Sequence, residues 1–311
     1  MTCKDCDVVC QRFGKHRNGL RRFRCPQCKR TYTEAHQLTL GEMYAPKDKI
    51  MLALQLLLEG NSIRSTMRIT GLDQNTIMKA LVLAGERCEK LMGRLIVNVP
   101  VKDVQADEIW SFIGKKEKQC GPDDDPNFGD AYCYTAIERH SKLILNFALG
   151  KRDQATTDIF IEGLRHATAH QNFQVTTDGF SPYRSAILNT LEDRVSFAML
   201  IKVYRASREG EQRYSPAEVV STEVVPVCGN PDPDRICTSH VERQNLTMRT
   251  NIRRFTRLTN GFSRKFENHW AALALYFAYY NFCRLHKTIR VTPAMEAGIA
   301  DHVWDLAELL A

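Results

Sequence analysis

The sequence of 311 residues lacks any long apolar run. No stretch reaches the roughly 18 consecutive apolar residues that indicate a membrane-spanning helix, and the nearest, residues 270–280, has the length of a buried helix. The N-terminus carries cysteines and charged residues where a secretory signal would be apolar. These absences argue against the membrane and secreted classes, so we expect a cytoplasmic protein.

Acidic residues are scarce in two parts of the chain. Residues 243–290 hold ten Lys/Arg and a single acid, Glu267, and residues 1–99 have a net charge of +8. Residues 100–242 have a net charge of −6 instead. Two basic segments suit a polyanion that is gripped at two places. Solvated helix faces produce the same charge runs, so nucleic acid is favoured only together with the motifs below.

Four of the eleven cysteines have the spacing of a zinc site. Cys3 and Cys6 form one Cys-x2-Cys pair, and Cys25 and Cys28 form a second. Two such pairs bring four thiolates into the tetrahedron that a structural Zn²⁺ accepts, with no position left for a reacting water. The sequence therefore predicts an N-terminal zinc ribbon. Reduced cysteines without a metal are the alternative, and Cys10 is close enough to compete as a ligand.

Three helices are expected between residues 46 and 92. Apolar residues recur at helical spacing, and glycines at positions 60 and 71 separate the helices. A Gly-bearing turn before the last helix is typical of a helix-turn-helix. A plain three-helix bundle has the same pattern, but DNA binding is the better interpretation behind a zinc ribbon in a basic segment. The residues that would then meet DNA begin the third helix: Gln74, Asn75, Thr76 and Lys79.

From residue 101 the pattern changes to that of an α/β domain. Strands are expected over 101–112, 130–138 and 143–149, and helices and strands alternate after them up to residue 203. This order indicates a mixed sheet with helices. Residues 204–237 are less regular and predict a long loop or a small β excursion.

Three carboxylates stand where these elements end or begin. Asp107 and Asp178 close predicted strands, and Glu242 lies at the start of a helix. Carboxylate oxygens from separate elements are what two Mg²⁺ (or Mn²⁺) ions need for phosphoryl transfer. Each carboxylate also has an ordinary explanation. Glu108 rivals Asp107 from the opposite strand face, Asp178 precedes a glycine and suits a turn, and Ser239-x-x-Glu242 is a capping box.

The order of these motifs resembles a bacterial insertion-sequence transposase with a DDE catalytic core, and it is most similar to the insertion-sequence-one type. The resemblance covers nearly the whole chain. It rests on the cysteine pairs, the three helices and four later segments: 107–110, 176–179, 238–249 and 280–294.

That resemblance implies a ribonuclease-H-like (integrase-like) α/β catalytic domain with a mixed sheet, in which Asp107, Asp178 and Glu242 are the catalytic metal ligands. The 63 residues between Asp178 and Glu242 exceed the compact spacing of retroviral-integrase relatives. Glu223 and Glu218 are therefore kept as alternatives to Glu242.

The implied protein is multidomain: a zinc ribbon (1–36), a helix-turn-helix domain (37–98), a catalytic domain (99–290) and a C-terminal tail helix (291–311). It would bind the terminal inverted repeats of its element, hydrolyse a phosphodiester there and transfer the 3′-hydroxyl strand to target DNA. Its partners would be double-stranded DNA in the nucleoid and further copies of itself, in a homodimer or higher oligomer.

Basic residues around Glu242 suit phosphate contacts. Those expected to bind DNA are His240, Arg243, Arg249, Arg253 and Arg254. Three other functions stay open: a non-catalytic or domesticated DNA-binding protein, a nuclease on the same fold, and a zinc-ribbon adaptor for protein partners.

Overall fold

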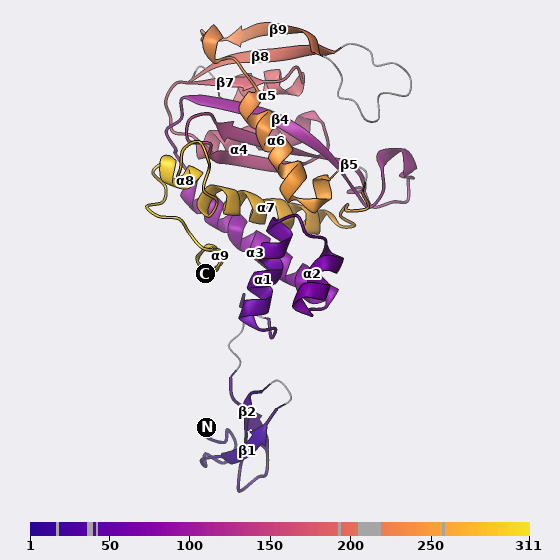
Figure 1. The fold of residues 1–311 in the computed structure, drawn as a ribbon, viewed down its shortest axis with the longest axis vertical. Coiled ribbons are helices and arrows are strands. Elements are labelled where there is room, and N and C mark those ends of the chain that lie inside the picture. The colour runs from indigo at the N-terminus through magenta and orange to yellow at the C-terminus, as the bar shows by residue number, and fades with distance from the viewer. Residues whose placement is uncertain (17–18, 36–39, 42, 192–193, 205–218, 257–258) are drawn as a thin grey trace. The chain divides into compact units, whose positions relative to one another are not determined.

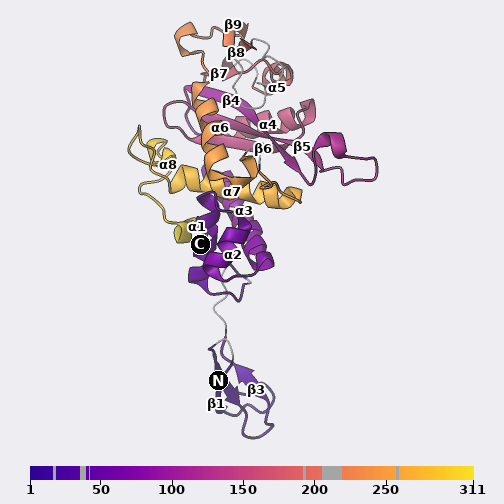
Figure 2. The same cartoon turned by 45° about the vertical axis from the view of Figure 1, so that its right-hand side comes forward.

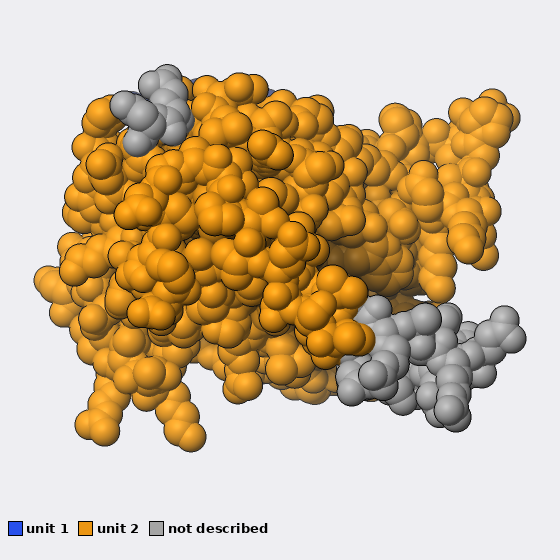
Figure 3. Space-filling view, turned by 90° about the horizontal axis from the view of Figure 1, so that it is seen from above, with its two compact units in different colours: residues 1–50 blue, residues 51–311 orange. Residues whose placement is uncertain are grey.

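The fold is seen in a computed structural model, which describes residues 1–311 apart from 17–18, 36–39, 42, 192–193, 205–218 and 257–258 (Figure 1). The chain divides into two compact units, residues 1–50 and residues 51–311, with the boundary inside the first helix. Figure 3 colours the two units separately and shows a recess in the surface of residues 51–311. Among the described residues, no helix is both long and apolar enough to cross a membrane.

The first unit contains a small antiparallel sheet. Its strands are β1 (Gln11–Lys15), β2 (Arg21–Arg24) and β3 (Thr31–Thr33), paired in that order. The buried cluster among them consists of cysteines, with Phe23 and Tyr32 packed against it. So small a core does not normally stabilise a fold without a metal or a disulfide.

The three predicted helices are present as α1 (Lys47–Leu58), α2 (Ile63–Thr70) and α3 (Gln74–Leu95). Their ends follow local chemistry. Ser62 caps α2 by accepting the Ser65 N–H, and Gly71 ends α2 at a φ of 69°. Asp73 then caps α3 by accepting the Asn75 N–H. The helices are confirmed, and their role as a helix-turn-helix stays a prediction.

Helix α3 packs closely on α7 (Phe266–Phe282). A Cβ built on Gly85 of α3 would lie 2.6 Å from the Cα of Ala271 in α7, so the two backbones approach each other where glycine has no side chain. Residues 51–311 accordingly form one compact unit. The expected boundary at residue 98 stays a prediction.

The second unit is built on a six-stranded sheet of order β6-β5-β4-β7-β8-β9, and the sheet is mixed, as the sequence predicts. Strand β4 is parallel to β7 and β7 to β8, whereas the other neighbours are antiparallel. This arrangement fits a ribonuclease-H-like domain. The strands are β4 (Asp103–Ile113), β5 (Gly129–Glu138), β6 (Ile144–Gly150), β7 (Phe173–Thr177), β8 (Val195–Tyr204) and β9 (Val219–Cys228). Strand β9 is the β excursion anticipated as one alternative for residues 204–237.

Helices cover both faces of this sheet. Helices α4 (Gln154–Ala167) and α5 (Pro182–Thr190) contact each other, and α4 packs on β5 and β6. On the other face α6 (Ser239–Asn251) lies across β4 and β5, and α7 runs beneath it (Figures 1 and 2). The first turn of α6 thus reaches the middle of the sheet.

Short elements complete the chain. Single 3-10 turns occur at Glu117–Gln119, Pro233–Arg235 and Arg253–Phe255. The expected tail helix over 291–311 consists instead of two four-residue helices, α8 (Pro293–Glu296) and α9 (Leu306–Leu309). Gly298, at a φ of 71°, lies between them in a conformation that a continuous helix does not allow.

Candidate functional site

Strand register places Asp107 beside Asp178. The parallel pairing of β4 and β7 aligns Ala106 with Thr177, so the next residue of each strand lies at the same level. Strand β7 ends at Thr177, and β4 continues. One carboxylate oxygen from each of Asp107, Glu108 and Asp178 lies within 4.8 Å of the others.

Asp107 and Glu108 point to opposite faces of β4, as alternation along a strand requires. Asp107 Oδ2 accepts from Nδ2 of Asn245 on α6 at 2.9 Å. Glu108 Oε2 accepts from the Tyr183 hydroxyl on α5 at 3.1 Å, and its Oε1 lies 2.5 Å from Arg152 Nε. Asp107 Oδ1 accepts the Glu108 N–H at 2.9 Å, so both oxygens of each carboxylate have protein partners. Glu108 is ion-paired with Arg152, whereas these hydrogen-bond donors to Asp107 are uncharged, which leaves Asp107 the more available metal ligand.

Burial and mutual repulsion perturb these carboxylates. Burial raises the pKa of Asp107 to about 7, and the charges of Glu108 and Asp178 contribute to that rise. Burial also raises the pKa of Glu108 and of Asp178 above their ordinary values. So much negative charge in one place suits a divalent cation, and the donors are the oxygens that Mg²⁺ and Mn²⁺ prefer.

Two further observations concern the fit of such a cation. Asn245 Oδ1 is buried without a hydrogen-bond partner among the described residues, beside the Asp107 carboxylate that Asn245 holds. Asp178 Oδ1 accepts the Phe180 N–H at 3.0 Å, so the turn anticipated after Asp178 is present as well. Oδ2 of Asp178 lies 3.6 Å from Nη2 of Arg152, whose guanidinium lines the same cavity. The site thus offers polar atoms beyond those that the fold itself uses.

Glu242 lies in the same cavity but outside the cluster of three. The cavity has a volume of about 890 Å³, and Asp107, Asp178 and Glu242 all line it. Glu242 pairs with Lys202 of β8 and accepts a hydrogen bond from the Thr238 hydroxyl. Thr238 stands at the N-cap of α6 with no side-chain cap bond, so the capping-box explanation of Glu242 is not what the structure shows.

Gln105 anchors the start of α6 and was not anticipated from the sequence. It lies two residues before Asp107 on the same face of β4 and is 1% exposed. Its Oε1 accepts from the backbone N–H groups of His240 and Val241 at 2.9 and 3.2 Å. A glutamine between Val104 and Ala106, in a strand expected to be buried, was the available signal, because a buried amide needs a partner.

Two more buried polar groups fasten the segment that leads to α6. Gln174 on β7 exchanges hydrogen bonds with the backbone of Asp232, at 2.8 and 3.3 Å. Asp103, 1% exposed, pairs with Arg235 at 2.9 Å and with Arg139 at 3.2 Å. These contacts fix the segment that precedes α6, so Glu242 lines the same cavity as Asp107.

Of the residues around Glu242 that were expected to contact DNA, one lines the carboxylate cavity and others face elsewhere. Arg249 lines the carboxylate cavity. His240 points instead to Lys142, with 3.3 Å between Nδ1 and Nζ. Arg254 Nε donates to Ser263 at 2.7 Å, and burial lowers its pKa to about 10. Arg243 is exposed and Arg253 half-buried.

The remaining expected residues lie away from the cavity or outside the described chain. At the start of α3, Gln74, Asn75 and Lys79 are exposed and Thr76 is half-buried. Glu223 is exposed on β9, opposite Ile201. Glu218 lies outside the described residues.

The N-terminal thiols gather as their spacing predicts. The Sγ atoms of Cys3, Cys6, Cys25 and Cys28 lie within 4.8 Å of one another. Cys10 is buried in the same core but is not part of this group of four. Four thiols at this separation fit a tetrahedral Zn²⁺ site.

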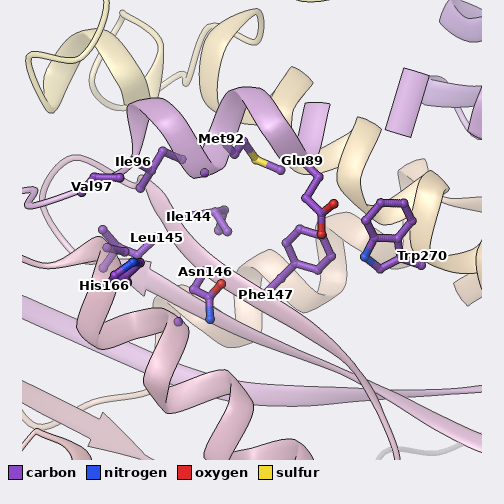
Figure 4. A pocket seen from close by; sticks show the side chains of 13 residues that line it. Glu89, Met92, Ile96, Val97, Ile144, Leu145, Asn146, Phe147, His166 and Trp270 are labelled. Atoms are coloured by element: carbon purple, nitrogen blue, oxygen red, sulfur yellow. The ribbon is translucent and has the colours of Figure 1, made fainter. Parts of the chain in front are cut away.

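A second cavity, of about 220 Å³, lies between α3, α4, β6 and α7 (Figure 4). Its wall is mainly apolar, with Met92 and Ile96 from α3, Phe147 from β6 and Trp270 from α7. Among the described residues that line this cavity, Glu89 carries a carboxyl group, and burial raises its pKa. His166 of α4 also lines it. The carboxylate cavity, which brings several acids together, is therefore the candidate functional site.

Comparison with known protein families agrees with the motifs. Residues 129–213 match a family model described as a DDE domain, of the IS240 transposase type. This part of the chain is similar to a DDE transposase domain. The resemblance to insertion-sequence transposases is thereby confirmed, and the matched type is IS240. Of the three expected ligands, Asp178 lies inside the matched part of the DDE domain.

Comparison with solved structures returns DNA transposases with low scores. The piggyBac transposase synaptic complex with hairpin DNA is 9% identical with a TM-score of 0.37, over 86% of this chain and 70% of that chain. A pre-cleavage Mos1 transpososome is 13% identical with a TM-score of 0.21, over 46% of this chain and 57% of that chain. The Mos1 mariner paired-end complex with Mn is 15% identical with a TM-score of 0.20, over 46% and 56%. TM-scores this low do not establish a shared fold. No curated protein sequence matches the chain.

Proposed function

We propose that this chain cuts DNA at the ends of an insertion sequence and joins the freed strand to target DNA. One observation carries the proposal: strand register places Asp107 and Asp178 side by side in a cavity that Glu242 also lines, in a chain with a DDE domain. Asp107, Asp178 and Glu242 would hold Mg²⁺ or Mn²⁺. Such ions activate the attacking oxygen and stabilise the leaving oxygen in phosphoryl transfer.

The protein groups around the ligands have distinct parts in this reaction. Asn245 orients the Asp107 carboxylate through its 2.9 Å hydrogen bond. Lys202 and Arg249 line the cavity together with four carboxylates, those of Asp107, Glu108, Asp178 and Glu242. Their positive charges would reduce the repulsion between these carboxylates and the phosphates of the DNA. In the first step water attacks the phosphodiester and the 3′-oxygen leaves. In the second step that 3′-hydroxyl attacks a target phosphodiester and displaces the 3′-oxygen of the target strand, and no covalent protein–DNA intermediate is needed.

DNA recognition falls to the basic N-terminal third in this proposal. Four thiolates would hold a structural Zn²⁺ and keep the small β-sheet folded. The exposed start of α3 would bind the terminal repeats through Gln74, Asn75, Thr76 and Lys79. Joining two element ends requires at least two copies of the chain.

The test uses purified protein, Mg²⁺ and duplexes that carry the terminal repeats flanking the gene. Asp107→Asn, Asp178→Asn and Glu242→Gln should each reduce cleavage by about a hundredfold or more, because a ligand carboxylate is lost. Glu223→Gln is the matched control, since Glu223 is an exposed carboxylate on β9. It should leave cleavage unchanged.

The rival functions predict different results in this assay. A wild-type protein that does not bind the duplex favours the zinc-ribbon adaptor. Cleavage that survives all three substitutions refutes the catalytic assignment. Wild-type protein that binds the duplex and leaves it intact is a DNA-binding protein without this activity. Cleavage without joining identifies a nuclease.

A further inference from the structure

We propose that Glu108 anchors Arg152 rather than binding metal, and that the Arg152 guanidinium contacts a phosphate of the DNA strand in the carboxylate cavity. The inference rests on the proposed function, since it takes DNA as the ligand of that cavity. It assigns parts to two residues that the metal site does not use.

Glu108 is held too firmly by the protein to be a good metal ligand. Its side chain is 3% exposed, and both of its oxygens are occupied. The Tyr183 hydroxyl that donates to Oε2 belongs to a ring with no exposed surface, so this bond is rigid. A metal at Glu108 would compete with the Arg152 cation for the same carboxylate, whereas the donors to Asp107, the Glu108 N–H and Asn245, are uncharged.

The guanidinium of Arg152 is fixed on three sides. Nε lies 2.5 Å from Glu108 Oε1, and Nη2 lies 3.6 Å from Asp178 Oδ2. The guanidinium carbon lies 4.1 Å from the centre of the Phe180 ring, which is stacking distance, and 5.9 Å from the Tyr132 ring. A cation held in this way loses little freedom when it binds a ligand, and that favours binding.

One edge of the guanidinium remains available for a phosphate. Arg152 is 40% exposed and lines the cavity with Asp107, Asp178 and Glu242. Among the described residues, no hydrogen-bond acceptor faces its Nη1 group. The guanidinium fork matches the geometry of phosphate oxygens, whereas a buried arginine that served only to neutralise Glu108 would not need to face the cavity. The metal ligands and Arg152 would thus hold neighbouring parts of the same DNA strand.

Salt dependence of DNA binding tests this contact without any catalysis. A protein that neutralises one phosphate fewer has a slope of log K against log salt that is shallower by about 0.9. We would measure anisotropy of a labelled terminal-repeat duplex, without divalent metal, over a salt series. Arg152→Ala should flatten the slope by about that amount and weaken binding roughly 10- to 100-fold, as expected for one charged hydrogen-bonded contact.

Two matched variants separate this contact from a general loss of charge or structure. Arg152→Lys keeps the charge and should keep the wild-type slope, with weaker binding because the fork is lost. Arg165→Ala removes an exposed arginine that pairs with Glu162 on α4, outside the cavity, and should change neither slope nor affinity. An Arg152→Ala slope equal to that of wild type would overturn the phosphate contact.

Metal binding tests the part assigned to Glu108. Calorimetry with Mn²⁺ should give Glu108→Gln the wild-type Kd, whereas Asp107→Asn should weaken binding at least about tenfold. Weakened Mn²⁺ binding by Glu108→Gln would make Glu108 a ligand and refute the anchor. A wild-type protein that binds the duplex and never cuts it would refute the proposed function alone, because the slope comparison needs no cleavage.

Discussion

The pKa of Asp107 predicts that removing this charge stabilises the metal-free protein while it abolishes the reaction. Burial, Glu108 and Asp178 raise that pKa from 3.8 to about 7. A tenfold change in proton affinity corresponds to about 1.4 kcal/mol, so the full rise in the pKa represents on the order of 4 kcal/mol. Solvent screening in an open cavity reduces this figure. We expect Asp107→Asn to raise the free energy of unfolding by about 1–3 kcal/mol at about pH 8.

The sign follows from proton binding. The folded state holds the Asp107 proton more tightly than the unfolded state, so wild-type stability falls as the pH rises from 3.8 to about 7. The Asn variant lacks that loss, and its advantage should shrink towards low pH. An asparagine carbonyl still accepts from Asn245, so this hydrogen bond is retained. The Glu108 N–H loses its acceptor Oδ1, which offsets part of the gain.

Thermal unfolding in a chelator at about pH 8 and about pH 5 measures the effect. A gain of 1 kcal/mol raises Tm by about 2–4 °C for a domain of this size. Saturating Mg²⁺ should stabilise the wild type by about 2.7 kcal/mol at a hundred times its Kd, and the variant much less. A variant that melts below wild type at both pH values, or equal stabilisation of both proteins by Mg²⁺, would refute the reasoning.

Three further predictions concern the rest of the chain. Cys25→Ser should lose bound zinc and unfold the N-terminal sheet, as measured by metal analysis and far-UV circular dichroism, whereas Cys10→Ser should keep its zinc. Gly85→Ala should lower the free energy of unfolding, measured in urea, by about 1–3 kcal/mol, because the added Cβ would lie 2.6 Å from the α7 backbone. Gly93→Ala is the control on the same helix: its Cβ meets open space, so it should be neutral or stabilising. Gln105→Ala should cost about 1–3 kcal/mol and reduce kcat for cleavage, since two N–H groups at the start of α6 lose their acceptor; an unchanged kcat would show that Gln105 does not position Glu242.

Local patterns in the sequence predict most elements of the fold. Paired Cys-x2-Cys spacing anticipated the cluster of four thiols, and alternation along residues 104–110 anticipated β4 with Asp107 and Glu108 on opposite faces. Turn residues marked the end of α2 and the start of α3. These features depend on neighbours within a few positions, so a single sequence carries them.

Long-range contacts lie beyond such patterns. The partners of Glu108 come from residues 152 and 183, and the acceptor that fixes the start of α6 is Gln105, more than a hundred residues earlier. The sequence also does not predict that Gly85 of α3 approaches Ala271 of α7 closely. Pairing across such distances depends on shape and on which buried polar groups find partners.

The three carboxylates show this division most clearly. By itself, the sequence determined which residue types are present, which elements bear them and which family they resemble, because these follow from composition, periodicity and motif order. Only the tertiary structure decided that Asp107 and Asp178 meet through parallel register, that Glu108 is taken up by Arg152 and Tyr183, and that Glu242 lies in the same cavity beside Lys202. The physical reason is that a carboxylate's role depends on the charges and hydrogen-bond donors around it, and the folded chain alone brings those together.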